Sequence, residues 1–405
     1  MTMHAPLADL AATTPDPDAS SPASLTMPTS AADLVDAADL AELAGLRVLV
    51  VGTGLIGTSV GMALRRHGTD VLLYDRHQAQ TAVAARRGAG RVWPHPDPSQ
   101  ADQTDPTSQA ALTGQAAGDP TGAGAGAGAA SGDTVMTDPW AQVRNAVDHV
   151  VIAVPPRDVG PTLVAWQRLL PTATFSDTAS VKVEPLVDAE RLGADMSRIC
   201  GAHPVAGRER GGPEWAVTDL FGNRPWVITP SAATSRLAQR HAGLIAVGCG
   251  AWVVRLDPRT HDFALGLLSH LPHIVASAFA ARLATMPEDL ARLAGPGLMD
   301  FTRIAGANAD LWTEIVEANA SPLADLLADV VADLETVRDA LGAGPGAAAA
   351  SGGGTGPVVE SLFRMGNTGR CRLEAAKALP APRAAVDDDH PGSIHPSGLD
   401  GRVPA

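Results

Sequence analysis

A glycine-rich turn between two predicted strands constrains this chain more than any other feature. The β-branched run 47–51 leads into Gly52-Thr53-Gly54-Leu55-Ile56-Gly57, which is followed by a helical pattern and a second apolar run over 70–74. The first glycine allows a tight turn, the second lets the backbone approach a pyrophosphate, and the third lets the helix pack closely on the sheet. Free N–H groups at the helix N-terminus then face the diphosphate. The sequence therefore predicts a dinucleotide-binding β-α-β unit.

The acidic residue after the second run indicates which dinucleotide is bound. Asp75 stands 18 residues after Gly57, where its carboxylate can accept hydrogen bonds from both ribose hydroxyls. The same charge repels a 2′-phosphate, so NAD is favoured over NADP. Two alternatives stay open, because Arg76 could accommodate that phosphate and Asp75 could simply cap a turn. The predicted cofactor-binding residues are Gly52, Thr53, Gly54, Leu55, Ile56, Gly57, Asp75, Arg76, Val154 and Pro155.

Strand and helix patterns predict an α/β fold with two parts. Short β-branched runs alternate with helical patterns up to about residue 256, which is typical of a parallel sheet covered by helices, whereas the later sequence is helical only. We expect a Rossmann-like dinucleotide-binding domain over 46–256 and an all-α domain over 257–382. Four segments are too poor in large apolar side chains to offset the entropy of ordering. They are a disordered extension 1–45 (with a possible short helix over 33–46), the inserts 97–133 and 343–356, and a disordered tail 383–405.

Composition narrows the class of partner. The 405 residues include 44 acidic and 30 basic side chains, a formal net charge of −14, which argues against nucleic acid or an anionic membrane as the main partner. No Lys or Arg precedes Arg47, and the apolar stretch 244–254 is too short to span a bilayer. Three scattered cysteines fit neither a disulfide framework nor a zinc site. We expect a cytoplasmic protein without a metal.

The candidate chemistry follows the later strands, because ligands of open α/β sheets bind at the carboxyl ends of strands. Ser180 and Lys182 follow one strand, and His203 follows the next between two glycines. A histidine in such a place suits a general base with a pKa near 6.5, and Ser180 could hydrogen-bond the same substrate hydroxyl. His203 could equally be a loop histidine satisfied by the backbone. Cys200 is expected to be a small buried hydrophobe rather than a nucleophile paired with His203.

The helical half holds a second polar group. Ser269-His270-Leu271-Pro272-His273 interrupts an apolar helix that Pro272 should kink, and the two histidines lack the acidic or cysteine partners of a metal site. Arg303 lies in a mostly apolar stretch, where a guanidinium requires a partner. That partner could be Asp300, in a structural pair, or a substrate carboxylate.

Taken together, these segments resemble the prephenate dehydrogenase family of tyrosine biosynthesis, which includes arogenate dehydrogenases. The resemblance covers 47–377 apart from the two inserts, and its motifs occur in the family's order. They are GTGLIGTS (52–59), DTASVK (177–182), GAHPVAG (201–207), SHLPH (269–273), DFTRIAGANADLW (300–312) and GNTGR (366–370).

The resemblance implies oxidative decarboxylation of prephenate to 4-hydroxyphenylpyruvate, with hydride transfer to NAD⁺. It assigns catalysis to His203, Ser180 and Lys182, with His203 accepting the proton of the ring hydroxyl. It assigns substrate binding to Arg303, His273, Ser269, Glu209, Asp300 and Trp312. A homodimer through the helical domain is also implied. The chain departs from the family at Gly295-Pro296-Gly297, where proline interrupts a glycine run.

Three other functions share features with this sequence. Arogenate dehydrogenase, using NAD or NADP, would give tyrosine directly, and Glu209 could receive the substrate ammonium. A β-hydroxyacid dehydrogenase or imine reductase shares the domain order, but the hydroxyacid enzymes need a lysine in the helical half, and none occurs between Lys182 and Lys377. A non-catalytic dinucleotide sensor is disfavoured because His203, Ser180 and Arg303 are all present.

Overall fold

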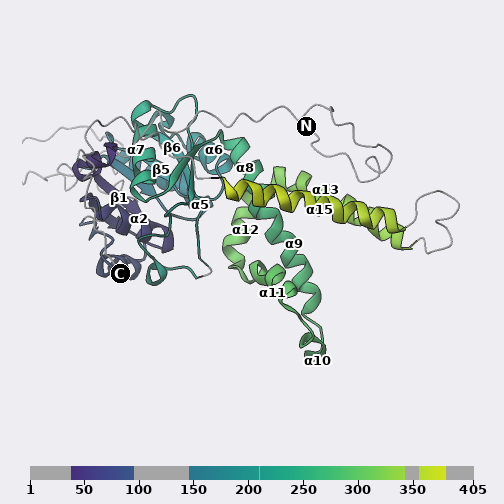
Figure 1. The fold of residues 1–405 in the computed structure, drawn as a ribbon. Coiled ribbons are helices and arrows are strands. Elements are labelled where there is room, and N and C mark those ends of the chain that lie inside the picture. Colours follow the sequence, from purple (N-terminus) through teal and green to yellow (C-terminus); the bar gives the residue numbers. More distant parts are fainter. Residues whose placement is uncertain (1–37, 95–145, 209, 343–354, 380–405) are drawn as a thin grey trace, which may run out of the picture.

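The structure is a computed structural model that describes residues 38–94, 146–208, 210–342 and 355–379 (Figure 1). Outside these ranges lie Glu209, the C-terminal tail, most of the N-terminal extension, the predicted insert 97–133 and all but the last two residues of the predicted insert 343–356. Those two residues begin a helix. Residues Ala38–Gly45 of the expected extension form the 3₁₀ helix η2, whose Leu43 is fully buried. Packed structure therefore begins earlier than the expected boundary at 46, because this short helix covers part of the core.

An eight-stranded sheet forms the first half of the fold, in the order β3-β2-β1-β4-β5-β6-β7-β8. Its strands are β1 (Arg47–Val51), β2 (Asp70–Tyr74), β3 (Arg91–Val92), β4 (His149–Ile152), β5 (Thr174–Asp177), β6 (Ile199–Pro204), β7 (Pro225–Thr229) and β8 (Trp252–Arg255). All neighbours are parallel except β6 and β7, which pair antiparallel. The parallel sheet expected from the sequence is therefore present, with one antiparallel pair, β6 and β7.

Helices cover both faces of the sheet, as continuous β-branched strands require. One core contains α2 (Leu55–Arg65), α7 (Arg236–Gly248) and η2, with α3 (Gln78–Arg86) at its edge. The other contains α5 (Pro156–Leu169) and α6 (Val183–Arg191). Alternate residues of β1 point into opposite cores, since Val48 and Val50 join the first and Leu49 and Val51 the second. The Rossmann-like three-layer arrangement expected from the sequence is present.

The second half is helical and extends away from the sheet in two arms (Figure 1). The helix α8 (Pro258–Leu265) continues through a π-helical turn, η6 (Gly266–His270), into α9 (Leu271–Ala280). One arm contains α9, α10 (Glu288–Ala291), α11 (Pro296–Thr302), η8 (Arg303–Gly306) and α12 (Ala309–Ala318). The other pairs α13 (Ala320–Gly342) with α15 (Thr355–Ala378), which run side by side.

The helical stretch Pro258–Leu283 is longer and more apolar than the sequence analysis expected of any segment. Its 26 residues reach a mean hydropathy of 1.5 in an 18-residue window, which suffices to cross a bilayer by length and composition. A core helix passes the same test, and this stretch carries Asp262 and His261 fully into the protein interior. Length and hydropathy alone are therefore weak support for a membrane span.

Candidate active site

The glycine-rich turn has the backbone geometry that the sequence predicts. Gly52 adopts φ +95°, and a Cβ there would lie 2.3 Å from the carbonyl oxygen of Ala153. A Cβ on Gly57 would lie 1.9 Å from the carbonyl oxygen of Gly52, so only glycine lets α2 begin this close to β1. A Cβ on Gly54 would meet no atom within 4 Å. The first and third glycines thus close the turn, and the second faces open space.

Asp75 lies at the end of β2 with its carboxylate directed at this turn. Its Oδ2 accepts hydrogen bonds from Thr53 N (2.7 Å) and Thr53 Oγ1 (3.2 Å), and its Oδ1 accepts one from His77 N (2.8 Å). Asp75 therefore does cap its own turn, as the alternative interpretation held. Oδ1 can still accept a further hydrogen bond, because each carboxylate oxygen has two lone-pair sites and Oδ1 has used one of them. Arg76 forms an ion pair with Asp158 of α5 (3.6 Å), so a second carboxylate lies beside it.

A hollow of about 530 Å³ connects these residues. Six predicted cofactor residues line it, namely Gly52, Gly54, Asp75, Arg76, Val154 and Pro155. Thr53 is buried behind the turn, while Leu55, Ile56 and Gly57 belong to the first turn of α2. The hollow also includes Tyr74 and Trp166, whose rings pack edge to face with centroids 5.1 Å apart. Sequence reasoning did not identify Trp166, because a tryptophan on α5 gives no local signal of binding.

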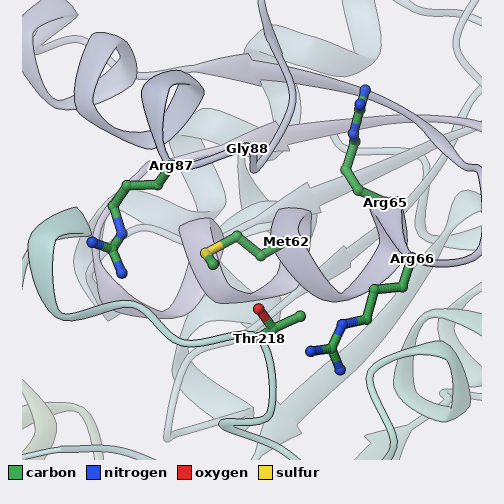
Figure 2. A pocket seen from close by; sticks show the side chains of 6 residues that line it. All are labelled: Met62, Arg65, Arg66, Arg87, Gly88 and Thr218. Carbon is green, nitrogen blue, oxygen red and sulfur yellow. The ribbon is translucent and has the colours of Figure 1, made fainter.

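A second hollow of about 320 Å³ lies at the opposite end of α2 (Figure 2). Its lining includes Arg65, Arg66 and Arg87, and Arg65 and Arg66 diverge from the end of the helix. Arg87 donates a hydrogen bond to the carbonyl oxygen of Ala216 (2.7 Å). Since α2 rises about 1.5 Å per residue, this hollow lies on the order of 15 Å from the glycine turn. It contains none of the predicted site residues.

The loops after β5 and β6 meet at the sheet edge where the glycine turn lies. Lys182 is fully buried and forms an ion pair with Asp177, and its Nζ also donates to the carbonyl oxygen of Ala202 (2.6 Å). The other oxygen of Asp177 accepts from Ala202 N (2.9 Å). This ion pair therefore locks the end of β5 to the residue before His203. Ser180 lies half-buried on the same loop as Lys182.

His203 is buried at the end of β6. Burial lowers the pKa of its imidazole well below 6.5, and the nearby His261, Lys182 and His270 lower it further. The ring is therefore neutral at physiological pH, as a general base must be. Its Nδ1 lies 2.9 Å from His261 Nε2. The alternative of a loop histidine satisfied by the backbone does not describe this contact, which joins two side chains.

The helical half contributes a second set of side chains. The π-helical turn η6 ends at His270, two residues before Pro272, where an α-helical hydrogen bond is lost. His273 donates from Nδ1 to the carbonyl oxygen of Ser269 (2.8 Å) and stacks on Trp312, the ring centroids being 3.5 Å apart. Burial and the positive charge of Arg303 lower the pKa of His273. The guanidinium of Arg303 is therefore close enough to His273 for its charge to act on the imidazole, whereas Asp300 is exposed on α11.

Sequence reasoning missed His261, Asp262 and Asn319, which connect the two sets. Asn319 Nδ2 donates to the carbonyl oxygen of Asp262 (2.8 Å) and lies 2.9 Å from His270 Nδ1. A histidine and an aspartate side by side in an apolar helix are costly to bury without partners. The sequence analysis singled out Arg303 because a charged side chain in an apolar helix requires a partner. The same reasoning would have singled out His261 and Asp262.

Burial raises the pKa of the Cys200 thiol to about 12, so a thiolate beside His203 is strongly disfavoured. Among the residues that the structure describes, no group of three or more His, Cys, Asp or Glu side chains could hold a metal ion.

Sheet, glycine turn and hollow define a dinucleotide-binding α/β protein whose polar site extends into a helical second half. Two family models match it, the nucleotide-binding domain of prephenate dehydrogenase over residues 119–255 and the dimerization domain of prephenate dehydrogenase over 257–345. The probable prephenate dehydrogenase NovF of Streptomyces niveus is 30% identical over 356 residues, covering 85% of this chain and 84% of that protein. This chain belongs to the prephenate dehydrogenase family and is a dehydrogenase.

Solved structures show the same fold. Prephenate dehydrogenase from A. aeolicus, in complex with hydroxyphenyl propionate and NAD⁺, is 23% identical with a TM-score of 0.60, covering 82% of this chain and 98% of that one. Arogenate dehydrogenase of Synechocystis is 24% identical with a TM-score of 0.56, covering 81% and 100%.

Proposed function

We propose that this chain oxidatively decarboxylates prephenate to 4-hydroxyphenylpyruvate with NAD⁺ as hydride acceptor. The observation that carries the proposal is the position of His203. Its buried, neutral imidazole lies at the end of β6, at the same edge of the sheet as the glycine turn. A base at the carboxyl ends of the strands reaches a substrate bound beside the nicotinamide. Family membership supplies the substrate class.

The glycine turn and its hollow fit a dinucleotide. Gly54 leaves room for a pyrophosphate at the start of α2, and Asp75 Oδ1 offers a remaining acceptor site to a ribose hydroxyl. Bound NAD⁺ would accept the hydride released from the ring carbon that bears the hydroxyl. We favour NAD over NADP because Asp75 and Asp158 place two carboxylates around Arg76, which is the one arginine or lysine among the described residues that line this hollow. A 2′-phosphate there would lie among side chains whose net charge is negative.

His203 would accept the hydroxyl proton as the ring carbon loses its hydride, so that the electron pair of the O–H bond forms a C=O bond. Loss of CO₂ from the ring then gives an aromatic phenolate, to which the proton on His203 can return. Formation of the aromatic ring makes these reaction steps strongly favourable, so the protein has mainly to position and polarise the substrate. Ser180 would orient the hydroxyl, and Lys182 would hold the loop through Asp177 and Ala202.

The carboxylates of the substrate require a positively charged partner, and its ring requires side chains that line the pocket. We assign carboxylate binding to Arg303, with His273 and Trp312 forming a stacked wall beside it. Ser269 fixes His273 through its carbonyl oxygen. Asp300 is assigned to the surrounding ionic network, as is Glu209, which lies outside the described residues.

We also infer that the protein works as a homodimer in the cytoplasm. Large apolar side chains stand exposed along the helical arms, among them Leu293 (79%), Phe363 (67%) and Leu334 (56%). Exposed apolar surface on this scale marks an interaction surface. The family's dimerization-domain model covers 257–345, so a second copy of this chain is the partner that suits it.

The activity is tested by following reduced-cofactor absorbance with prephenate or arogenate, each with NAD⁺ or NADP⁺. Turnover of prephenate with NAD⁺ is expected to give the highest kcat/KM of the four mixtures. Faster turnover of arogenate would replace the substrate assignment and keep the mechanism. No turnover in any mixture, with NAD⁺ binding intact by calorimetry, would overturn the proposal and favour a sensor.

A further inference from the structure

A chain of side-chain hydrogen bonds leads from His203 into the protein interior. His203 Nδ1 lies 2.9 Å from His261 Nε2, and His261 Nδ1 lies 2.7 Å from Asp262 Oδ1. All three residues are buried, with exposed fractions of 8%, 0% and 3%. His203 comes from β6, whereas His261 and Asp262 come from α8, so the chain joins the two halves of the fold.

Asp262 is held rigidly at the far end of this chain. Its Oδ1 also accepts a hydrogen bond from Lys182 N (2.7 Å), and its Oδ2 accepts one from Val183 N (2.8 Å). These N–H groups open α6, where the helix dipole favours a negative charge. The carboxylate therefore serves as a cap for α6, supplied by a distant helix, and its position is not free to adjust.

The direction of each hydrogen bond follows from this arrangement. A carboxylate only accepts, so His261 must carry its proton on Nδ1. Burial lowers the pKa of His261, which keeps the ring neutral and leaves its Nε2 unprotonated. That Nε2 can then only accept, so His203 must donate from Nδ1. The remaining nitrogen of His203, Nε2, is left with its lone pair free.

We propose that His261 and Asp262 are positioning residues that hold His203 as the Nδ1–H tautomer, with Nε2 as the basic nitrogen. If the chain has the proposed function, on which this inference rests, the hydroxyl proton of the substrate is transferred to Nε2 of His203. As the O–H bond breaks and the Nε2–H bond forms, His203 becomes an imidazolium still hydrogen-bonded to His261. The Asp262 carboxylate, one ring farther, stabilises the positive charge. The logic is that of a buried aspartate orienting a catalytic histidine, here with a second histidine in between.

Asn319, in the turn between α12 and α13, completes the frame. It binds the carbonyl oxygen of Asp262 and contacts His270 Nδ1, so the main chain of α8 and the π-helical turn are tied at one point. Lys182 binds the same Asp262 through its main-chain N–H and the residue before His203 through its Nζ. Both ends of the relay are thus held by Lys182.

Kinetics of two His261 variants test the relay. His261→Phe keeps a ring but removes both hydrogen bonds, and we expect kcat to fall at least 100-fold with KM for prephenate changed less than threefold. His261→Gln keeps one acceptor and one donor at the end of the side chain, and we expect it to recover at least tenfold of that loss. His241→Phe is the matched control, a buried histidine bonded to Thr174 outside the site, and should leave kcat unchanged. Wild-type kcat in His261→Phe, or equal losses in both His261 variants, would overturn the proposal.

Nitrogen NMR of the histidine-labelled full-length protein provides a readout that needs no substrate. The spectrum is expected to show His203 and His261 as Nδ1–H tautomers, with His203 assigned by the signal lost in His203→Asn. In Asp262→Ala the carboxylate that accepts from His261 Nδ1 is absent, so both rings are expected to lose their preference for the Nδ1–H tautomer. A His203 signal protonated at Nε2 in the wild type would reject the relay, whatever the activity. The expected tautomers in a protein without turnover would keep the relay and reject the proposed function.

Discussion

At the residue scale, His203 has two properties that a single substitution can separate, its place beside the nucleotide site and its basic nitrogen. Asparagine is smaller and polar but cannot take up a proton. We expect His203→Asn to bind NAD⁺ with wild-type affinity while kcat falls by about 10²- to 10⁴-fold, the range typical of losing a general base. Calorimetric titration with NAD⁺ and steady-state rates with prephenate check both halves. Near-normal turnover would remove His203 from the mechanism.

The three glycines of the turn make a second residue-scale prediction, because they have different surroundings. In Gly57→Ala the new Cβ meets the carbonyl oxygen of Gly52 at 1.9 Å, so the turn must shift. We expect a loss of about 1–3 kcal/mol in the free energy of unfolding and weaker NAD⁺ binding. In Gly54→Ala the Cβ meets nothing within 4 Å. This variant should therefore unfold like the wild type in urea and yet bind NAD⁺ at least tenfold more weakly, because the methyl group occupies the pyrophosphate's place.

Residue-scale features also decide how much the sequence could reveal. The geometry at Gly52 and Gly57 depends on contacts within one β-α unit, so a six-residue pattern predicts it. The partner of His203 lies 58 residues away on another element, and no local pattern encodes that distance. Asp75 shows the intermediate case, since its position was predictable but its bond to Thr53 depends on how β1 and β2 pair.

At the element scale, α5 and α12 are joined by an ion pair between unequal partners. Arg157 is 69% exposed at its side chain, whereas Glu314 is 12% exposed and its Oε2 is buried without a hydrogen-bond partner. Removing the arginine leaves a mostly buried carboxylate unpaired, which costs more than an exposed pair contributes.

We therefore expect Arg157→Ala to lower the free energy of unfolding by about 1–3 kcal/mol, and Glu314→Gln to change it less. The double variant should recover stability relative to Arg157→Ala, because no unpaired charge is left. Urea unfolding of the four proteins forms a double-mutant cycle. An Arg157→Ala protein as stable as the wild type would show that α5 and α12 are held by packing alone.

At the element scale, the local sequence pattern does not predict the direction of each strand. The run 225–229 has the same β-branched character as the parallel strands, and its antiparallel pairing with β6 depends on the connection between them. The π-helical turn, unlike the strand direction, could be predicted in part. Pro272 lacks a backbone N–H, and this predicts a local break in the helix near it. What the pattern could not reveal is that this break carries His270 toward His261.

At the scale of the whole molecule, buried histidines make stability depend on pH. Burial lowers the pKa of His149, His203 and His261, and lowers that of His270 to about 4. The unfolded chain binds protons at these groups near pH 6.5, whereas the folded chain does not, so stability is fully present above pH 6.5 and is lost as the pH falls below it.

Each group contributes at most about 1.4 kcal/mol per pH unit to that loss. We expect the unfolding temperature to be nearly flat from pH 7 to 8.5 and to drop steeply between pH 6.5 and 5. His149→Leu should flatten part of this drop, because His149 lies between Thr174 and Ser176 and away from the site. Calorimetric scans across this range check it. An unfolding temperature that stays constant down to pH 5 would contradict neutral buried histidines.

The exposed apolar surface makes the last prediction, which concerns assembly. On α13 the side chains of Val331, Leu334 and Leu341 are 44%, 56% and 62% exposed, and their spacing of three and seven residues places them on one face. A face of this kind in water is unfavourable unless another chain covers it. We expect the wild type to sediment as a dimer and Leu334→Glu to weaken the dimer at least tenfold. Val187→Glu, at a side chain of equal exposure on α6, should leave the dimer intact. If Leu334→Glu sediments as the wild type does, this face of α13 lies outside the interface, and a monomeric wild type would reject the dimer itself.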